Sequence, residues 1–207
     1  MGDVHETEVR GWKLAHKRIV VRRKIGDADR KEIEIMKRLS SHVHMIQLVG
    51  TYTHRQFLGL LLHPVAICDL HTFFEDVEAW TALSTHGYTH AAQLETIDVG
   101  HKERLEALGY DFPSSNSESN AWPVYSRIGC LVSAITYLHE QKIRHKDLKP
   151  SNILLSRGRL WLSDFGSATD FSLLSQSATD NERGTPRYFS PEVGRFTILH
   201  MSSVMVD

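Results

Sequence analysis

The feature that most restricts the fold is a short predicted hairpin, Ile153–Leu162, that has acidic and amide residues at both ends. Two apolar runs flank the polar turn Ser156–Arg159, which is the pattern of two antiparallel strands. Asp147 and Asn152 precede the hairpin, and Asp164 follows it. Because the two ends of a hairpin lie side by side, we expect these three side chains to converge on one point.

The chemistry of this set points to a magnesium and phosphate site. Two carboxylates and an amide are hard oxygen ligands of the kind that Mg²⁺ prefers. Lys149 lies between Asp147 and Asn152 and adds a point charge suited to a phosphate. The alternative is that these are ordinary solvated loop residues. That interpretation fits any one of them, but it fits the whole set at this spacing poorly.

The same residues carry a resemblance to a known family. His145–Asn152 has the form H-x-D-L-K-P-x-N, and Asp164-Phe165-Gly166 begins 17 residues (164 − 147) after Asp147. This pattern resembles that of protein kinases. Gly184–Glu192 resembles the end of a kinase activation segment, with Ser-Pro-Glu in place of Ala-Pro-Glu. The resemblance extends from about Ile19 to Glu192.

The resemblance implies a role for each residue of the set. Asp147 would be the catalytic base that orients the substrate hydroxyl and accepts its proton, and Lys149 would contact the transferring phosphate. Asn152 and Asp164 would hold Mg²⁺. Thr185 resembles the threonine that hydrogen-bonds the catalytic loop in serine/threonine kinases. ATP and Mg²⁺ are thus the implied cofactors, and proteins bearing Ser or Thr are the implied substrates.

The resemblance also implies an ion pair between a helix glutamate and a lysine that binds ATP. Glu32 is the candidate glutamate, because Glu34 points to another face of the predicted helix. For the lysine, aligning Val20–Ile25 on the V-A-x-K-x-I form places Arg23 at the key position, and a shift by one residue gives Lys24. Only one of the two can point inward. We favour Lys24 on chemical grounds, since arginine does not replace lysine at such a site.

The segment between the two halves of the chain resembles the kinase hinge that binds adenine. Leu62 would be the gatekeeper residue. The carbonyl of His63 and the N–H of Val65 would meet the adenine edge. Asp69 could reach the ribose, and Leu154 would form the floor under the adenine ring.

Hydrophobic periodicity and turn residues predict the order of the elements along the chain. The predicted elements are a strand at Arg18–Ile25, a helix at Asp27–Leu39 capped by Asp27 or Asp29, strands at Met45–Tyr52 and Phe57–Leu62, a helix starting at Asp69–Val77, a helix at Lys102–Leu108 ended by Gly109, and a helix at Pro123–Glu140 with one apolar face. A strand-rich part followed by a helical part predicts the α+β class. The resemblance narrows this to a protein-kinase-like two-lobed fold.

The expected domain is a partial kinase domain at residues 11–192. It would have a small β-rich N-lobe at about 11–66, an insertion at about 78–120, and a truncated, mostly helical C-lobe at 121–192. Residues 193–207 form a tail without resemblance to the kinase fold. With that tail, the apolar face of the Pro123–Glu140 helix is expected to be partly uncovered, which would favour association.

Two departures from the family pattern support a second interpretation. No G-x-G-x-x-G motif precedes the first predicted strand, since Gly2, Gly11 and Gly26 are the only early glycines. The chain also ends soon after Glu192, where a kinase helical lobe would continue. The alternative to an ATP-dependent protein serine/threonine kinase is therefore a catalytically impaired, pseudokinase-like fragment that acts as an interaction module.

Composition excludes several other classes. The formal net charge is −1, which gives no sign of binding to nucleic acid or to a membrane surface. Two cysteines without a CxxC motif, and no signal peptide, favour an intracellular, cytoplasmic protein. The 13 histidines do not form a metal-ligand spacing with cysteines or carboxylates. The oligomeric state is not predicted.

Overall fold

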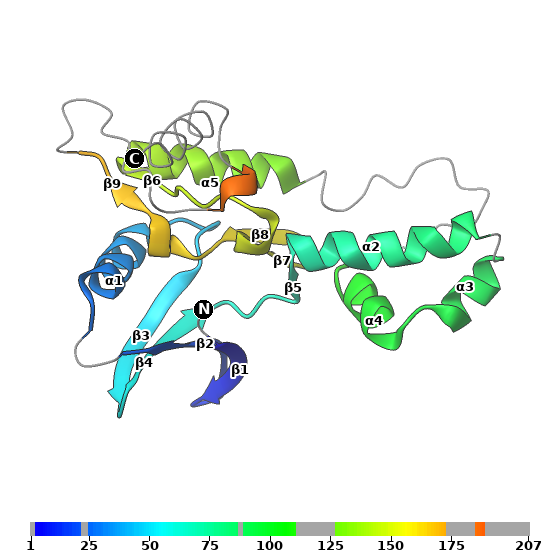
Figure 1. The fold of residues 1–207 in the computed structure, drawn as a ribbon, viewed down its shortest axis with the longest axis horizontal. Coiled ribbons are helices and arrows are strands. Elements are labelled where there is room, and N and C mark those ends of the chain that lie inside the picture. The colour runs from blue at the N-terminus through cyan, green and yellow to red at the C-terminus, as the bar shows by residue number, and fades with distance from the viewer. Residues whose placement is uncertain (1–2, 22–24, 87–88, 111–126, 173–184, 189–207) are drawn as a thin grey trace, which may run out of the picture.

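The computed structural model describes residues 3–21, 25–86, 89–110, 127–172 and 185–188. Its elements, in chain order, are β1 (Asp3–Val9), β2 (Trp12–Val20), α1 (Asp27–Leu39), β3 (Gln47–His54), β4 (Phe57–His63), β5 (Cys68–Asp69), α2 (Leu70–Thr85), α3 (His90–Thr96), α4 (Val99–Ala107), α5 (Ile128–Glu140), β6 (Ile143–Arg144), β7 (Ile153–Ser156), β8 (Arg159–Leu162) and β9 (Thr169–Asp170). A β-rich part with α1 is followed by a mostly helical part, as Figure 1 shows. The expected α+β arrangement is confirmed.

The N-terminal part is an antiparallel sheet with strand order β1-β2-β4-β3. Arg10 and Gly11 both have positive φ, 52° and 82°, and connect β1 to β2 in a two-residue hairpin turn. The strand predicted at Arg18–Ile25 is therefore wrong in position, because β2 covers Trp12–Val20 and residues 22–24 lie outside the described residues. The prediction missed β1 because the strand is polar and largely exposed.

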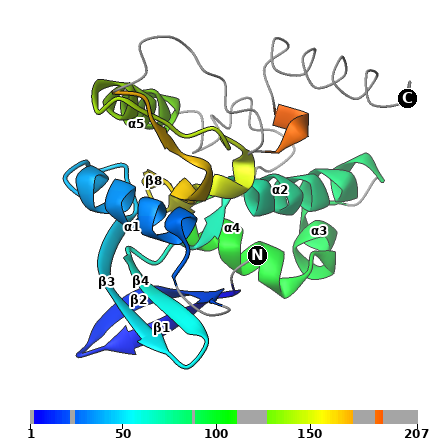
Figure 2. The same cartoon turned by 60° about the vertical axis from the view of Figure 1, so that its left-hand side comes forward.

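Helix α1 has the predicted bounds, and its buried stripe holds Glu32, Ile35, Met36 and Leu39. Gly26 is the N-cap residue, and its N–H donates to the Asp29 carboxylate at 3.2 Å. Figure 2 shows α1 between the sheet and α5. The helix therefore contacts both parts of the molecule.

The two parts are joined through one shared core. The backbone N–H of Ile46 donates to the Leu162 carbonyl at 3.0 Å, and the Leu162 N–H donates to the His44 carbonyl at 2.9 Å. Strands β7 and β8 form the predicted hairpin and pair with β5 in a second small sheet. Buried side chains from α1, β4, β8 and α5 form one cluster, which includes Met36, Leu60 and Leu162.

Helix α5 covers Ile128–Glu140, so it ends at the predicted residue, whereas the predicted start at Pro123 lies outside the described residues. Its apolar face is partly uncovered, as expected. Ala134 and Leu138 are buried, whereas Ile128 is 54% exposed and Val132 is 57% exposed. Across the described part of the chain, none of the helices combines the length and the hydropathy that crossing a bilayer requires.

Helices α2 to α4 occupy most of the region expected to be an insertion. Gly109 follows α4 with φ +79°, and its N–H donates to the Glu106 carbonyl, so it ends the helix as predicted. Asp76 on α2 is fully buried and accepts two hydrogen bonds from the Arg104 guanidinium, at 2.8 and 2.6 Å. His101 also contacts this carboxylate. Residues 111–120 of the expected insertion lie outside the described residues.

We predict that Arg104→Met destabilises the fold by about 3 kcal/mol, because it leaves the buried Asp76 carboxylate without its main cationic partner. Equilibrium urea unfolding measures this change. Glu103→Gln, at an exposed position of the same helix, is the control and should stay within about 0.5 kcal/mol of the parent. Equal stability of the two variants would show that the ion pair does not stabilise the α2–α4 contact.

Candidate active site

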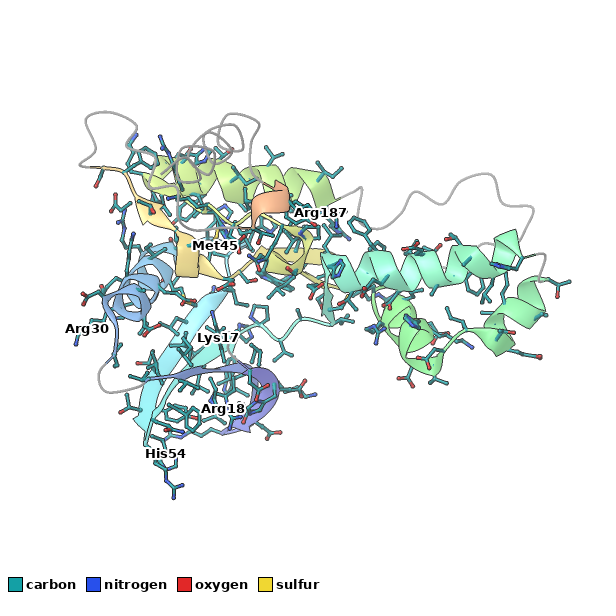
Figure 3. The ribbon with its side chains drawn as sticks, viewed as in Figure 1. Lys17, Arg18, Arg30, Met45, His54 and Arg187 are labelled. Atoms are coloured by element: carbon teal, nitrogen blue, oxygen red, sulfur yellow. The ribbon has the colours of Figure 1, made fainter. Side chains whose placement is uncertain are left out.

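A lysine on β2 connects the sheet, α1 and the segment after β8. The Lys17 Nζ donates to the Glu32 carboxylate at 2.8 Å and to the Asp164 carboxylate at 3.0 Å. The side chains of Lys17 and Glu32 are only 17% and 7% exposed. Burial alone would lower the pKa of Lys17, but the two carboxylates outweigh it and raise that pKa above its ordinary value. The amine is therefore a fixed positive charge at this point, labelled in Figure 3.

Lys17 is a candidate for the site that the sequence analysis missed. The predicted candidates, Arg23 and Lys24, lie outside the described residues, so neither is placed here. Leu14–Ile19 reads L-A-H-K-R-I and fits the V-A-x-K-x-I form six residues upstream of the alignment on Val20–Ile25. Lys17 and Glu32 are also separated by 15 residues (32 − 17), which leaves room for the connection from β2 to α1. This second match could have identified the lysine.

The loop before β7 surrounds one carboxylate with donors. Asp147 accepts from the Lys149 Nζ at 2.8 Å, from the Thr185 hydroxyl at 2.7 Å and from the Asn152 amide at 3.2 Å. Burial raises the pKa of Asp147, but the hydrogen bonds from Lys149 and Thr185 outweigh it, so the pKa lies below its usual value. The carboxylate is thus ionised at neutral pH. The predicted contact of Thr185 with the catalytic loop is confirmed.

A buried histidine connects this loop to the segment that carries Asp164. The His145 Nε2 donates to the Ser163 carbonyl at 2.9 Å, and the Asp147 N–H donates to the His145 Nδ1 at 3.3 Å. These two contacts need a neutral ring, and burial lowers the pKa of His145 accordingly. The ring also lies 5.2 Å from that of Phe165. His145 therefore sets the position of Asp147 relative to the residues around Asp164.

Asn152 and Asp164 are the residues of the set that fit a divalent cation. Asn152 is buried, and its backbone carbonyl accepts from both the N–H and the hydroxyl of Ser163, the residue before Asp164. Asp164 adopts φ 60°, and its side chain is 46% exposed. Oxygen donors from an amide and a half-exposed carboxylate suit Mg²⁺. Among the described residues, no cluster of three or more His, Cys, Asp or Glu forms a metal site of another kind.

The predicted adenine-binding residues lie on the connection between the two parts. His63 ends β4, a cis peptide bond joins it to Pro64, and Val65 follows at a half-buried position. Leu154 on β7 pairs with Asp69 on β5. Asp69, however, accepts from the Thr72 N–H at 2.8 Å at the start of α2. Its carboxylate therefore acts as a helix cap here, and a contact with ribose stays a prediction.

These residues bring together what phosphoryl transfer requires. Lys17 supplies a fixed cation at the sheet, and the side chains of Asn152 and Asp164 carry oxygen atoms of the kind that Mg²⁺ prefers. Asp147 is an ionised carboxylate with an ammonium group beside it. Such a site can screen the charge of phosphate groups and accept a proton from a hydroxyl.

Comparisons with known proteins agree with this chemistry. Residues 114–197 match the protein kinase domain family. Serine/threonine-protein kinase PLK4 of Drosophila grimshawi is 34% identical over 148 residues, which are 69% of this chain and 16% of that protein. Serine/threonine-protein kinase fused of Drosophila melanogaster is 30% identical over 165 residues, 79% of this chain and 15% of that protein. Serine/threonine-protein kinase ULK3 of Xenopus laevis is 50% identical over 66 residues, 30% of this chain and 14% of that protein.

The chain thus spans about a sixth or less of the length of these three relatives. The matches are to serine/threonine kinases, and they agree with the fold and with the site motifs. The chain belongs to the protein kinase family and contains part of its catalytic domain.

Proposed function

We propose that this chain binds ATP with Mg²⁺ and transfers the γ-phosphate to serine or threonine hydroxyls of proteins. The observation that carries the proposal is the Asp147 carboxylate, held ionised by Lys149 and Thr185. An ionised carboxylate beside a phosphate-binding lysine can orient a hydroxyl and take its proton as the phosphorus–oxygen bond forms. The link of Lys149 to Thr185, at 2.9 Å, fixes the lysine close to that carboxylate.

The other residues of the site would bind the nucleotide. The Lys17 amine would bind the phosphates, and Glu32 would keep the amine directed at them. Asn152 and Asp164 would hold Mg²⁺, which, when bound, bridges phosphate oxygens and neutralises their charge. His63 and Val65 lie on the connection that would take the adenine ring, and Leu154 on β7 would lie under that ring.

A non-catalytic interaction module is the second candidate function. The β1–β2 hairpin has a single glycine, Gly11, in its turn, and the sequence contains no G-x-G-x-x-G motif to cover the phosphates. A chain of this kind would bind nucleotide weakly, or bind it without turnover. The presence of both Asp147 and Asp164 favours the enzyme over this alternative.

A thermal-shift titration with ATP and Mg²⁺ tests the proposal. We expect the melting temperature to rise with ATP only when Mg²⁺ is present, because the proposed site binds the two together. A ligand that binds only the native state raises the free energy of unfolding by about 2.7 kcal/mol at 100 times its Kd. Asp164→Ala should abolish the Mg²⁺-dependent part of the shift. Asp27→Ala, which removes an exposed carboxylate from the first turn of α1, should keep it. A shift of the parent that does not depend on Mg²⁺ would contradict the assignment of Asp164.

A further inference from the structure

A second attachment joins α1 to the segment that carries Asp164. The Arg38 guanidinium, in the last turn of α1, donates to the Asp170 carboxylate on β9. The same guanidinium donates to the Gln141 carbonyl at the end of α5, at 2.7 Å. The Tyr137 hydroxyl donates to the Arg38 carbonyl at 3.5 Å and lies 2.9 Å from the Ser41 hydroxyl. One arginine of α1 thus contacts two elements that are far from it in the sequence, β9 and α5.

The two attachments connect the same pair of segments. Lys17 contacts Glu32 on α1 and Asp164 before the Phe165 turn. Arg38 follows Glu32 by six residues, about 9 Å along the helix axis. Asp170 likewise follows Asp164 by six residues. A helix held at a single point can swing about that point, whereas two points separated along its axis fix its direction.

The partners of Arg38 are themselves held in place. The backbone of Asp170 pairs with Ile143 in the β6–β9 ladder, and its carboxylate accepts from the Ser172 N–H at 2.8 Å. These bonds from Ser172, followed by the bond from Arg38, lower the pKa of Asp170 to about 2. Arg144 on β6 stacks on the Phe171 ring instead. The Arg38–Asp170 pair is therefore charged throughout the neutral range.

The solvent exposure of the Arg38–Asp170 pair limits its contribution to the stability of the fold. The side chains of Arg38 and Asp170 are 42% and 35% exposed. Ion pairs at such positions add little to global stability. Their effect on geometry can be larger, because a shift of Glu32 by a few tenths of an ångström moves the Lys17 amine that it binds.

We propose that Arg38 is a positioning residue, which holds α1 against β9 so that Glu32 keeps Lys17 aligned with Asp164. The effect on nucleotide rests on the proposed function, whereas the attachment of α1 does not. The Arg38 guanidinium contacts Asp170 and Gln141, so it would act on the nucleotide through Glu32 and Lys17. Its loss should weaken ATP binding while leaving the fold nearly as stable as before.

Two measurements on Arg38→Ala test this proposal. We expect the Kd for ATP with Mg²⁺ to rise about tenfold, a typical size for coupling between two positions. Hydrogen exchange should also become faster in residues 27–39 than in the parent. Arg30→Ala is the matched control, since Arg30 is exposed on the outer side of the same helix (Figure 3). Arg30→Ala should change neither the Kd for ATP nor the rate of hydrogen exchange.

A charge exchange separates positioning from general packing. Arg38→Asp alone should weaken ATP binding at least as much as Arg38→Ala. Adding Asp170→Arg should recover part of the lost affinity, because the exchanged pair restores the ion pair between α1 and β9 but not the bond to the Gln141 carbonyl. The proposal would be overturned if the double variant recovered no affinity for ATP. It would also be overturned if hydrogen exchange in residues 27–39 were the same in Arg38→Ala and Arg30→Ala. Faster exchange in Arg38→Ala with no ATP binding by the parent would support the attachment and contradict the proposed function.

Discussion

Replacing Asp147 with Asn is expected to lower kcat for phosphoryl transfer by about 10²- to 10⁴-fold, the usual contribution of a positioned general base. The amide can still accept the hydrogen bond from Thr185, whose hydroxyl lies 2.7 Å from the carboxylate. It cannot accept a proton at neutral pH, and it leaves the Lys149 ammonium without its anionic partner. The loss should therefore appear in the chemical step and not in nucleotide binding.

Phosphate transfer from labelled ATP to a serine-containing peptide measures this loss. The Mg²⁺-dependent thermal shift of Asp147→Asn should remain close to that of the parent. Asp27→Asn is the control for removal of one carboxylate at an exposed position of α1, and it should retain full activity. An active Asp147→Asn variant would show that another group orients the substrate hydroxyl. A parent that binds ATP but transfers no phosphate would favour the interaction-module alternative.

The site around Asp147 could be predicted because its geometry is local. Asp147 and Asn152 lie five residues apart, and the β7–β8 hairpin brings Asn152 next to Ser163 and hence to Asp164. A hairpin has a fixed register, so the residues at its two ends meet whatever the rest of the chain does. The bounds of α1 were predictable for a similar reason, because its apolar spacing matches one helix face.

The β1–β2 hairpin could not be predicted from the pattern of apolar residues alone. Strand β1 lies at the edge of the sheet and is mostly exposed, so its residues show little of the alternation that marks a half-buried strand. The turn residues Arg10 and Gly11 also differ from the Asn-Gly type that signals such a hairpin. Without β1, the cluster of β-branched residues at Arg18–Ile25 looked like the first strand. That shift moved the expected lysine from Lys17 to Lys24.

Substitution of Lys17 with Met should have the second large effect, a fall in kcat/KM for ATP on the order of 10²-fold, as when a preorganised donor is removed from a site of developing charge. Lys24→Met is the matched variant, because it removes the other candidate amine from the same region of the chain. We expect it to change kcat/KM less than about twofold. Steady-state kinetics with ATP varied, in the presence of Mg²⁺, separates the two.

Stability could confuse this comparison, because Lys17→Met leaves the Glu32 carboxylate 7% exposed and without its cation. A charge stranded in this way typically costs about 3–5 kcal/mol. The double variant Lys17→Met/Glu32→Leu removes both charges, and apolar replacement of a buried pair is often neutral for stability. We therefore expect the double variant to melt near the parent temperature and still fail to respond to ATP.

Together, these variants identify the lysine that binds ATP, whatever the result. A double variant that is stable but insensitive to ATP means that the Lys17 amine binds the nucleotide itself, since the fold no longer explains the loss. Conversely, if Lys24→Met abolished the Mg²⁺-dependent shift while the double variant kept it, the contact of Lys17 with Glu32 and Asp164 would be structural only. Lys24 would then be the lysine that binds ATP, which is the residue given by the one-residue shift from the Val20–Ile25 alignment.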